Sequence, residues 1–142
     1  MITVKELLSR KAGVLYSVEP DQPVLEAIQL MADHGVGAVL VMKDTALQGI
    51  VSERDYARKV VLMGRSSSDT PVWQIMSSPV VTVSPSDSLD TCMHTMTERR
   101  IRHLPVAEGA RVVGMLSIGD LVKAVIDEQK RTIEHLEAYI HS

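Results

Sequence analysis

Two copies of one short motif have residue types and spacing that could bind a ligand. GIVSERD at 49–55 and GMLSIGD at 114–120 share the form Gly, two apolar residues, Ser, any two residues, Asp. If each Ser begins a helix after a strand, its hydroxyl and the free N–H groups of the first helical turn can bind an anion. The Asp three residues later can accept hydrogen bonds from both hydroxyls of a ribose. The motif is therefore a candidate nucleotide site.

The same residues also have a purely structural explanation. Ser52 and Ser117 suit the N-cap position of the following helix, and Asp55 and Asp120 stand where a carboxylate completes a capping box. For a single copy of the motif, capping alone is the simpler interpretation. The two roles are compatible because both depend on the same helix start.

Basic residues surround the first copy of the motif. The first group is Arg54, Arg58, Lys59 and Arg65, and a second group is Arg99, Arg100 and Arg102. Each of these residues alone could belong to a solvated helix face. Together they lie near a helix start whose free N–H groups can bind an anion, and this favours a ligand that carries phosphate. The second motif is followed by Leu121 and Val122, with only Lys123 nearby. We therefore expect two unequal sites, of which the second is empty or takes a less charged ligand.

The motif lies within a longer internal repeat. An offset of 65 positions, without gaps, aligns Gly49 with Gly114, and it also aligns two prolines, several apolar residues and both motif residues. The matching pairs are Val18 and Val83, Pro20 and Pro85, Met31 and Met96, Val41 and Val106, Ser52 and Ser117, and Asp55 and Asp120. The sequence therefore predicts two copies of one unit of about 60 residues, a length typical of repeat units that cannot bury a core alone.

Hydrophobic periodicity predicts the order strand, helix, strand, strand, helix in each unit. Apolar residues at helical spacing predict helices near 24–31 and 89–96, with Asp21 and Ser86 as candidate caps. Short apolar runs at 37–42 and 103–107, each followed by a turn and a second run ending at Ser52 or Ser117, predict hairpins. Helices then follow over 52–63 and from 117 to the C-terminus. The predicted fold class is α/β (α+β), with two pseudo-symmetric repeats sharing a core.

The turn-rich segment 64–71 predicts the linker between the repeats. The first repeat, with the N-terminal segment, is assigned to 1–66, and the second, with an extended C-terminal helix, to 67–142. An apolar stripe that includes Ile133, Leu136 and Ile140 runs past the end of the repeat. Because one chain has little left to cover this stripe, we expect a homodimer.

Composition excludes several classes of protein. The chain has 142 residues, 45% hydrophobic and 23% charged, which is the balance of a soluble globular protein. The net charge of −3 argues against sequence-independent binding to nucleic acid or to an anionic membrane. No stretch is long and apolar enough to span a membrane, and the start lacks the pattern of a secretory signal. A cytoplasmic location is therefore expected, and the single Cys92 fits a reducing compartment.

Catalytic motifs are missing from the sequence. It contains no HExxH, GxSxG, P-loop or GxGxxG pattern, and its histidines have no paired spacing for a metal. Cys92 falls on the apolar face of its predicted helix, where a nucleophile is not expected. A regulatory protein is thus a better hypothesis than an enzyme.

The sequence resembles the tandem cystathionine-beta-synthase (CBS) domain pair, or Bateman module. The resemblance covers residues 4 to 128 and depends on both GhhSxxD motifs (h, hydrophobic), on RIRHLPV at 100–106, and on SVEP at 17–20 and TVSP at 82–85. GIVSERDYARKV and GRSS are most similar to small stand-alone CBS-pair proteins of bacteria and plant organelles. The resemblance implies binding of AMP, ADP, ATP, S-adenosylmethionine or sometimes NAD, in two clefts between the repeats.

The resemblance also implies roles for individual residues. In one cleft Asp55 would bind the ribose and Ser52 the phosphate, with Val81, Ile101 and Arg102 around the base and phosphate. The second cleft would use Asp120 and Ser117, together with Tyr16, Val36, Gly37 and His103. Tyr16 could stack on a base or cover the core, and His103 could be a hydrogen-bonded structural histidine in an apolar strand.

These observations favour a non-catalytic sensor that binds adenine nucleotides and signals to an unidentified partner protein. A different class, a constitutive scaffold with vestigial clefts and a working C-terminal helix, is the main alternative. A nucleotide-handling enzyme is a third hypothesis. Thermal stabilisation by nucleotides distinguishes the first from the second, and product formation would identify the third.

Overall fold

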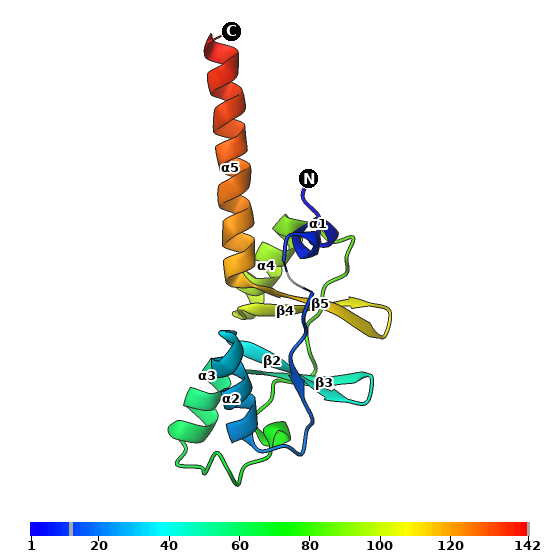
Figure 1. The fold of residues 1–142 in the computed structure, drawn as a ribbon, viewed down its shortest axis with the longest axis vertical. Coiled ribbons are helices and arrows are strands. Elements are labelled where there is room, and N and C mark those ends of the chain that lie inside the picture. Colours follow the sequence, from blue (N-terminus) through cyan, green and yellow to red (C-terminus); the bar gives the residue numbers. More distant parts are fainter. Residues whose placement is uncertain (12, 142) are drawn as a thin grey trace.

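The computed structural model describes residues 1–11 and 13–141, and it shows a mixed α+β architecture of two similar repeats. Figure 1 shows the repeats one above the other, with the last helix projecting beyond the second repeat. The elements in chain order are α1 (Val4–Ser9), β1 (Ser17–Val18), α2 (Val24–His34), β2 (Ala38–Lys43), β3 (Ala46–Ser52), α3 (Glu53–Tyr56), η1 (Ala57–Val61), η2 (Val72–Gln74), α4 (Leu89–Arg99), β4 (His103–Glu108), β5 (Arg111–Ser117) and α5 (Ile118–His141).

The two antiparallel hairpins, β2–β3 and β4–β5, repeat each other in register. The first pairs Ala38 with Ser52, and the second pairs His103 with Ser117 at the equivalent positions. In the first repeat β1 adds a parallel strand, with Val18 opposite Val41. In the second repeat the predicted first strand is reduced to one isolated parallel bridge, Val83 to Val106. The repeat predicted from sequence is therefore confirmed, except that its second sheet has two strands.

The predicted caps of α2 and α4 are wrong by two residues. Asp21 and Ser86 lie in hydrogen-bonded turns, in which the Gln22 amide donates to Glu19 and the Asp87 amide donates to Ser84. The helices begin only after these turns. Ser88 caps α4 by accepting from the Thr91 amide at 3.0 Å, whereas the N-cap of α2 is Pro23, which has no side-chain cap.

The helices that follow the two motifs differ in form. The predicted helix over 52–63 is one α-helical turn, α3, continued by the π-helical η1. The equivalent α5 is a continuous α-helix of 24 residues. π-helical turns are uncommon and are frequent at functional sites, so this segment is one structural difference between the two repeats.

The buried side chains form two clusters, so the expectation of a single shared core is wrong. The N-terminal segment packs in the cluster of the second repeat, where the Leu89 amide donates to the Ile2 carbonyl at 2.9 Å. The linker packs in the cluster of the first repeat, where the Val72 amide donates to the Gln22 carbonyl at 2.9 Å. Each repeat therefore completes its core with the segment that precedes the other repeat.

Two further features bear on function. No helix in the described part of the chain is long and apolar enough to cross a membrane.

Cys92 is fully buried in the core cluster of the second repeat. Burial, aided by the charge of Asp87, raises the pKa of its thiol to about 11. A thiol in this state is a poor nucleophile at neutral pH.

Candidate functional site: two clefts between the repeats

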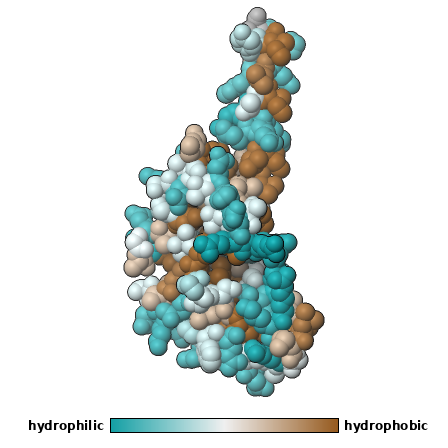
Figure 2. Space-filling model, turned by 180° about the vertical axis from the view of Figure 1, so that it is seen from behind, coloured by the Kyte–Doolittle hydropathy of each residue, from teal (hydrophilic) through white to brown (hydrophobic). Residues whose placement is uncertain are grey.

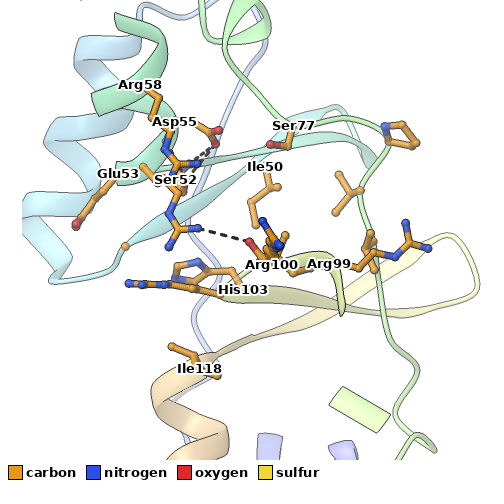
Figure 3. Close-up of a pocket in the computed structure, with 17 residues that line it drawn as sticks. Ile50, Ser52, Glu53, Asp55, Arg58, Ser77, Arg99, Arg100, His103 and Ile118 are labelled. Carbon is orange, nitrogen blue, oxygen red and sulfur yellow. Dashed lines mark hydrogen bonds between the residues drawn. The ribbon is translucent and has the colours of Figure 1, made fainter. Parts of the chain in front are cut away.

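The larger cleft has a volume of about 650 Å³ and is lined by both repeats. Figure 3 shows Ser52, Asp55 and Arg58 on the side of the first repeat, and Arg99, Arg100 and His103 across the cleft. The volume lies within the range of small-molecule sites, roughly 300–1,000 Å³. Every residue assigned to this cleft by the family resemblance, namely Ser52, Asp55, Val81, Ile101 and Arg102, lies in its lining.

Ser52 and Asp55 hold the helix start at the edge of this cleft. The Asp55 amide donates to Ser52 Oγ at 3.1 Å, and the Ser52 amide donates to Asp55 Oδ2 at 3.0 Å. This reciprocal pair is a complete capping box, as the sequence predicts. The Asp55 side chain is 14% exposed, so its carboxylate is fixed in place and still open to the cleft.

Lys59 and Arg65, which the sequence groups with this basic cluster, are not among the described residues that line the cleft. Lys59 Nζ lies 3.3 Å from Asp55 Oδ1 and donates to the Ile75 carbonyl at 3.0 Å. Lys59 therefore compensates the charge of the Asp55 carboxylate from outside the described lining of the cleft.

Five arginines line the larger cleft, against two carboxylates, Glu53 and Asp55. The arginines are Arg54, Arg58, Arg99, Arg100 and Arg102. Arg100 has the left-handed backbone conformation, φ 54°, that Gly35 has at the equivalent end of α2. This C-cap aims the Arg100 carbonyl at Arg54, whose Nη1 lies 3.5 Å away. The cleft is thus strongly electropositive around an anion-ready helix start.

The smaller cleft has a volume of about 450 Å³ and is built around the second motif. All six residues predicted for it lie in its lining: Tyr16, Val36, Gly37, His103, Ser117 and Asp120. The Ser117 amide donates to Asp120 Oδ2 at 2.8 Å, and the Asp120 amide donates to Ser117 Oγ at 3.2 Å. The capping geometry of the first motif is thus repeated here.

Lys11 is the main residue of the smaller cleft that the sequence analysis missed. Its Nζ lies 2.7 Å from Asp120 Oδ2 and also donates to the Met115 carbonyl at 2.8 Å. Burial alone would raise the pKa of Asp120, but hydrogen bonds from Lys11 and Ser117 bring it below its ordinary value. No local signal reveals this pair, because Lys11 lies 109 positions from its partner.

A stacked pair of rings forms another part of the smaller cleft. The rings of Tyr16 and His34 lie 4.1 Å apart at an interplanar angle of 19°. Both residues line the cleft. Tyr16 therefore already stacks on a partner within the chain, and sequence reasoning had not connected His34 with it.

Gly37 and His103 form a wall shared by both clefts. A Cβ atom at position 37 would lie 3.3 Å from His103 Nε2, so the glycine permits this close approach. Burial lowers the pKa of His103, and Lys11 and Arg102 lower it further, while Asp120 opposes them. The His103 imidazole and Gly37 thus separate the two sites.

Comparison with known proteins agrees with this architecture. The CBS domain family model matches residues 4–62 and 72–127. A mitochondrial CBS domain-containing protein of Arabidopsis thaliana, CBSX3, is 43% identical over 125 residues, which are 84% of this chain and 61% of that protein. The chain thus spans less than two thirds of the length of this relative.

Two solved structures extend the comparison. A CBS-domain protein from Burkholderia ambifaria is 51% identical, with a TM-score of 0.87, and the match covers 89% of this chain and 96% of that one. A CBS domain protein from Pyrobaculum aerophilum, complexed with AMP, is 28% identical, with a TM-score of 0.75, covering 84% and 89%. The repeats, the motifs and these matches define a tandem CBS pair. The chain belongs to the CBS domain family.

Proposed function

We propose that this protein is a non-catalytic sensor that binds an adenosyl nucleotide in the larger cleft and transmits its occupancy to a partner protein. The observation that carries the proposal is the cluster of five arginines around the capping box of Ser52 and Asp55. The AMP complex of the Pyrobaculum aerophilum relative supports this ligand class. The smaller cleft, in which Lys11 already engages Asp120, is the weaker site.

The ligand has a defined orientation in this proposal. Its phosphate lies at the start of α3, where Ser52, Arg58 and Arg102 provide donors. Its ribose hydroxyls donate to Asp55, and its base packs between Val81 and Ile101. Arg54, Arg99 and Arg100 strengthen the electrostatic attraction without fixing the ligand position.

A ligand panel tests the proposal. The thermal unfolding of the full chain is measured with AMP, ADP, ATP, NAD and S-adenosylmethionine, each at several concentrations. A ligand present at about 100 times its dissociation constant should add about 2.7 kcal/mol to the free energy of unfolding. A matched titration with inorganic phosphate separates nucleotide recognition from simple anion binding. If none of the five ligands stabilises the chain, the sensor proposal fails and the scaffold hypothesis replaces it.

Other parts of the proposal depend less directly on the cleft. Chromatography of each ligand after incubation with the protein tests for turnover. If a converted product appears, the enzyme hypothesis replaces the sensor proposal.

A cytoplasmic location stays a prediction, since the Arabidopsis relative is described as mitochondrial.

A further inference from the structure

The ring of His103 lies in the wall between the two clefts and lines both of them. His103 is the first residue of β4 and is half-buried. Figure 3 shows its ring on the second repeat's side of the larger cleft, across from Ser52. None of the described residues forms a hydrogen bond with the ring, so the groups around it act on it only through their charge. The proton on this ring therefore depends on the charges in the two clefts.

In the free protein, burial and two cations disfavour a proton on His103. Burial lowers the pKa of the imidazole most, and the charges of Lys11 and Arg102 lower it further. The Asp120 carboxylate favours the proton from the side of the smaller cleft, but Lys11 pairs with it at 2.7 Å. Because the pKa lies below the ordinary 6.5, most His103 rings carry no charge at pH 7.5.

Other charged groups face the ring from the first repeat. A Cβ atom at position 37 would lie 3.3 Å from His103 Nε2 and 4.0 Å from Glu53 Oε1, so α3 brings a carboxylate to the same wall. The remaining titratable residues in the described linings are Arg54, Asp55, Arg58, Arg99, Arg100, Tyr16 and His34. His34 lines only the smaller cleft, where it stacks on Tyr16. In the described lining of the larger cleft, His103 is therefore the group best suited to gain a proton near neutral pH.

An anion in the larger cleft would reverse the balance of charge at the ring. A phosphate at the start of α3 adds about two negative charges and neutralises the nearby Arg102. The ring would then have a phosphate on one side and Asp120 on the other, and opposite charges on both sides favour the imidazolium form. Figure 2 shows strongly hydrophilic side chains across the junction of the two repeats. Water, and with it a proton, can therefore reach this region.

We infer that a phosphate-bearing ligand in the larger cleft binds together with one proton, which a ring nitrogen of His103 takes up from the solvent. No covalent bond of the ligand changes in this step. The inference rests on the proposed position of the phosphate. Linkage is reciprocal, so the proton strengthens ligand binding as much as the ligand strengthens proton binding. Affinity for AMP should fall as pH rises through this range, by up to about tenfold per pH unit, whereas adenosine affinity should not. The sensor would thus respond to pH as well as to nucleotide.

Calorimetry of AMP binding counts the proton. At pH 7.5 the AMP phosphate is almost fully deprotonated, so the binding enthalpy measured in buffers of different ionisation enthalpy reports protons taken up by the protein. The wild type should take up roughly 0.3 to 1 proton per AMP and almost none per adenosine. His103→Gln should lose this uptake, and His94→Gln, an exposed histidine outside both described linings, should keep it. AMP binding without proton uptake in the wild type, or equal uptake in His103→Gln, would overturn the inference.

NMR titration of the His103 ring in the wild-type chain tests the inference without a variant. The ring proton on Cε1 is followed against pH in sodium chloride, in sodium sulfate of equal ionic strength, and with AMP. Sulfate keeps two negative charges throughout this range, so it separates the effect of an anion from that of a nucleotide. The titration midpoint should move to higher pH by about one unit or more with AMP and with sulfate, relative to chloride.

The outcomes separate this inference from the proposed function. If AMP stabilises the chain and the His103 midpoint does not move, the inference fails and the sensor proposal stands. If sulfate moves the midpoint and none of the nucleotides binds, the sensor proposal fails and the inference stands for anions in general. A midpoint that moves with neither AMP nor sulfate overturns the inference.

Discussion

The two clefts share one backbone design and differ in charge. Each is built on a Ser and an Asp that cap the helix after a hairpin, with matching hydrogen bonds. The larger cleft presents five arginines against two carboxylates. The described lining of the smaller cleft holds one lysine and one aspartate, and these two are paired with each other. The two helix starts are therefore alike, while the charged residues around them differ.

The two motif aspartates also differ in which part of the chain provides the lysine that contacts them. Asp55 is contacted by Lys59, one turn further along its own helix, at 3.3 Å. Asp120 is contacted at 2.7 Å by Lys11, which reaches the site only because the N-terminal segment packs on the second repeat. The first pair is local, whereas the second is a closer, long-range contact to the oxygen that also accepts from the Ser117 amide. We expect this closer lysine to compete with a ligand for Asp120.

The largest expected effect is that of Asp55→Ala on nucleotide binding. Loss of two charge-assisted hydrogen bonds to the ribose, about 1.5 to 3 kcal/mol each, should weaken AMP binding at least tenfold. Loss of the cap should lower the free energy of unfolding by only about 1 kcal/mol. Asp120→Ala is the matched control, and it should change AMP affinity far less. Calorimetry and urea unfolding measure the two quantities. Equally small losses in both would mean that Asp55 is only a cap.

The next effect concerns phosphate. Arg58→Ala and Arg102→Ala should each weaken AMP binding by about 1.5 to 3 kcal/mol, while adenosine binding changes little, because only the phosphate contacts these groups. Arg111→Ala, in β5 outside both cleft linings, is the control. AMP affinity should also fall as salt concentration rises. Adenosine binding as tightly as AMP would show that the arginine cluster has another role.

A smaller and opposite effect is expected from Lys11→Met. Removing the lysine frees the Asp120 carboxylate, so the smaller cleft should bind adenosine severalfold more tightly. The lost ion pair is partly exposed and should cost at most about 1 kcal/mol of stability. Lys5→Met, an exposed lysine outside the cleft, provides the comparison. Weaker adenosine binding in Lys11→Met would show that Lys11 is a ligand contact and not a competitor.

The smallest effect is a dependence of stability on pH at the shared wall. Burial lowers the pKa of His103 below its ordinary value of 6.5, so between these two values the unfolded chain binds a proton that the folded chain does not. The free energy of unfolding should therefore rise with pH until about pH 6.5, by at most about 1.4 kcal/mol per pH unit. Urea unfolding of the wild type and His103→Gln between pH 5 and 8 isolates this contribution.

Asp120 provides an internal check on that pH profile. Its pKa is lowered in the folded chain, so its contribution to stability is present above its ordinary value of 3.8 and is lost as pH falls through the folded value. The two groups thus act in separate pH ranges. A His103→Gln chain with the same slope between pH 5 and 6.5 as the wild type would contradict the assignment to His103.

Much of the fold follows from local patterns. The repeat is visible directly as matching residues at an offset of 65 positions. The two hairpins and both pairs of capping bonds are predicted by periodicity and by the Ser and Asp spacing, because these interactions join residues close in sequence. The first strand of the second repeat and the caps of α2 and α4 were predicted less well. Their outcome depends on how the turn that contains Pro20 or Pro85 packs against the neighbouring hairpin, and the sequence pattern does not specify this packing.

The sequence alone determined the duplicated motif, the excess of arginine near its first copy and the apolar stripe of α5. Only the tertiary structure decided that Lys11 reaches Asp120, that Tyr16 stacks on His34, and that His103 separates the clefts. The same holds for the placement of Lys59 and Arg65 outside the larger cleft. The physical reason is that a side chain's charge and spacing are local properties, whereas its neighbours depend on packing. Here the N-terminal segment packs on the second repeat, and the linker packs on the first repeat.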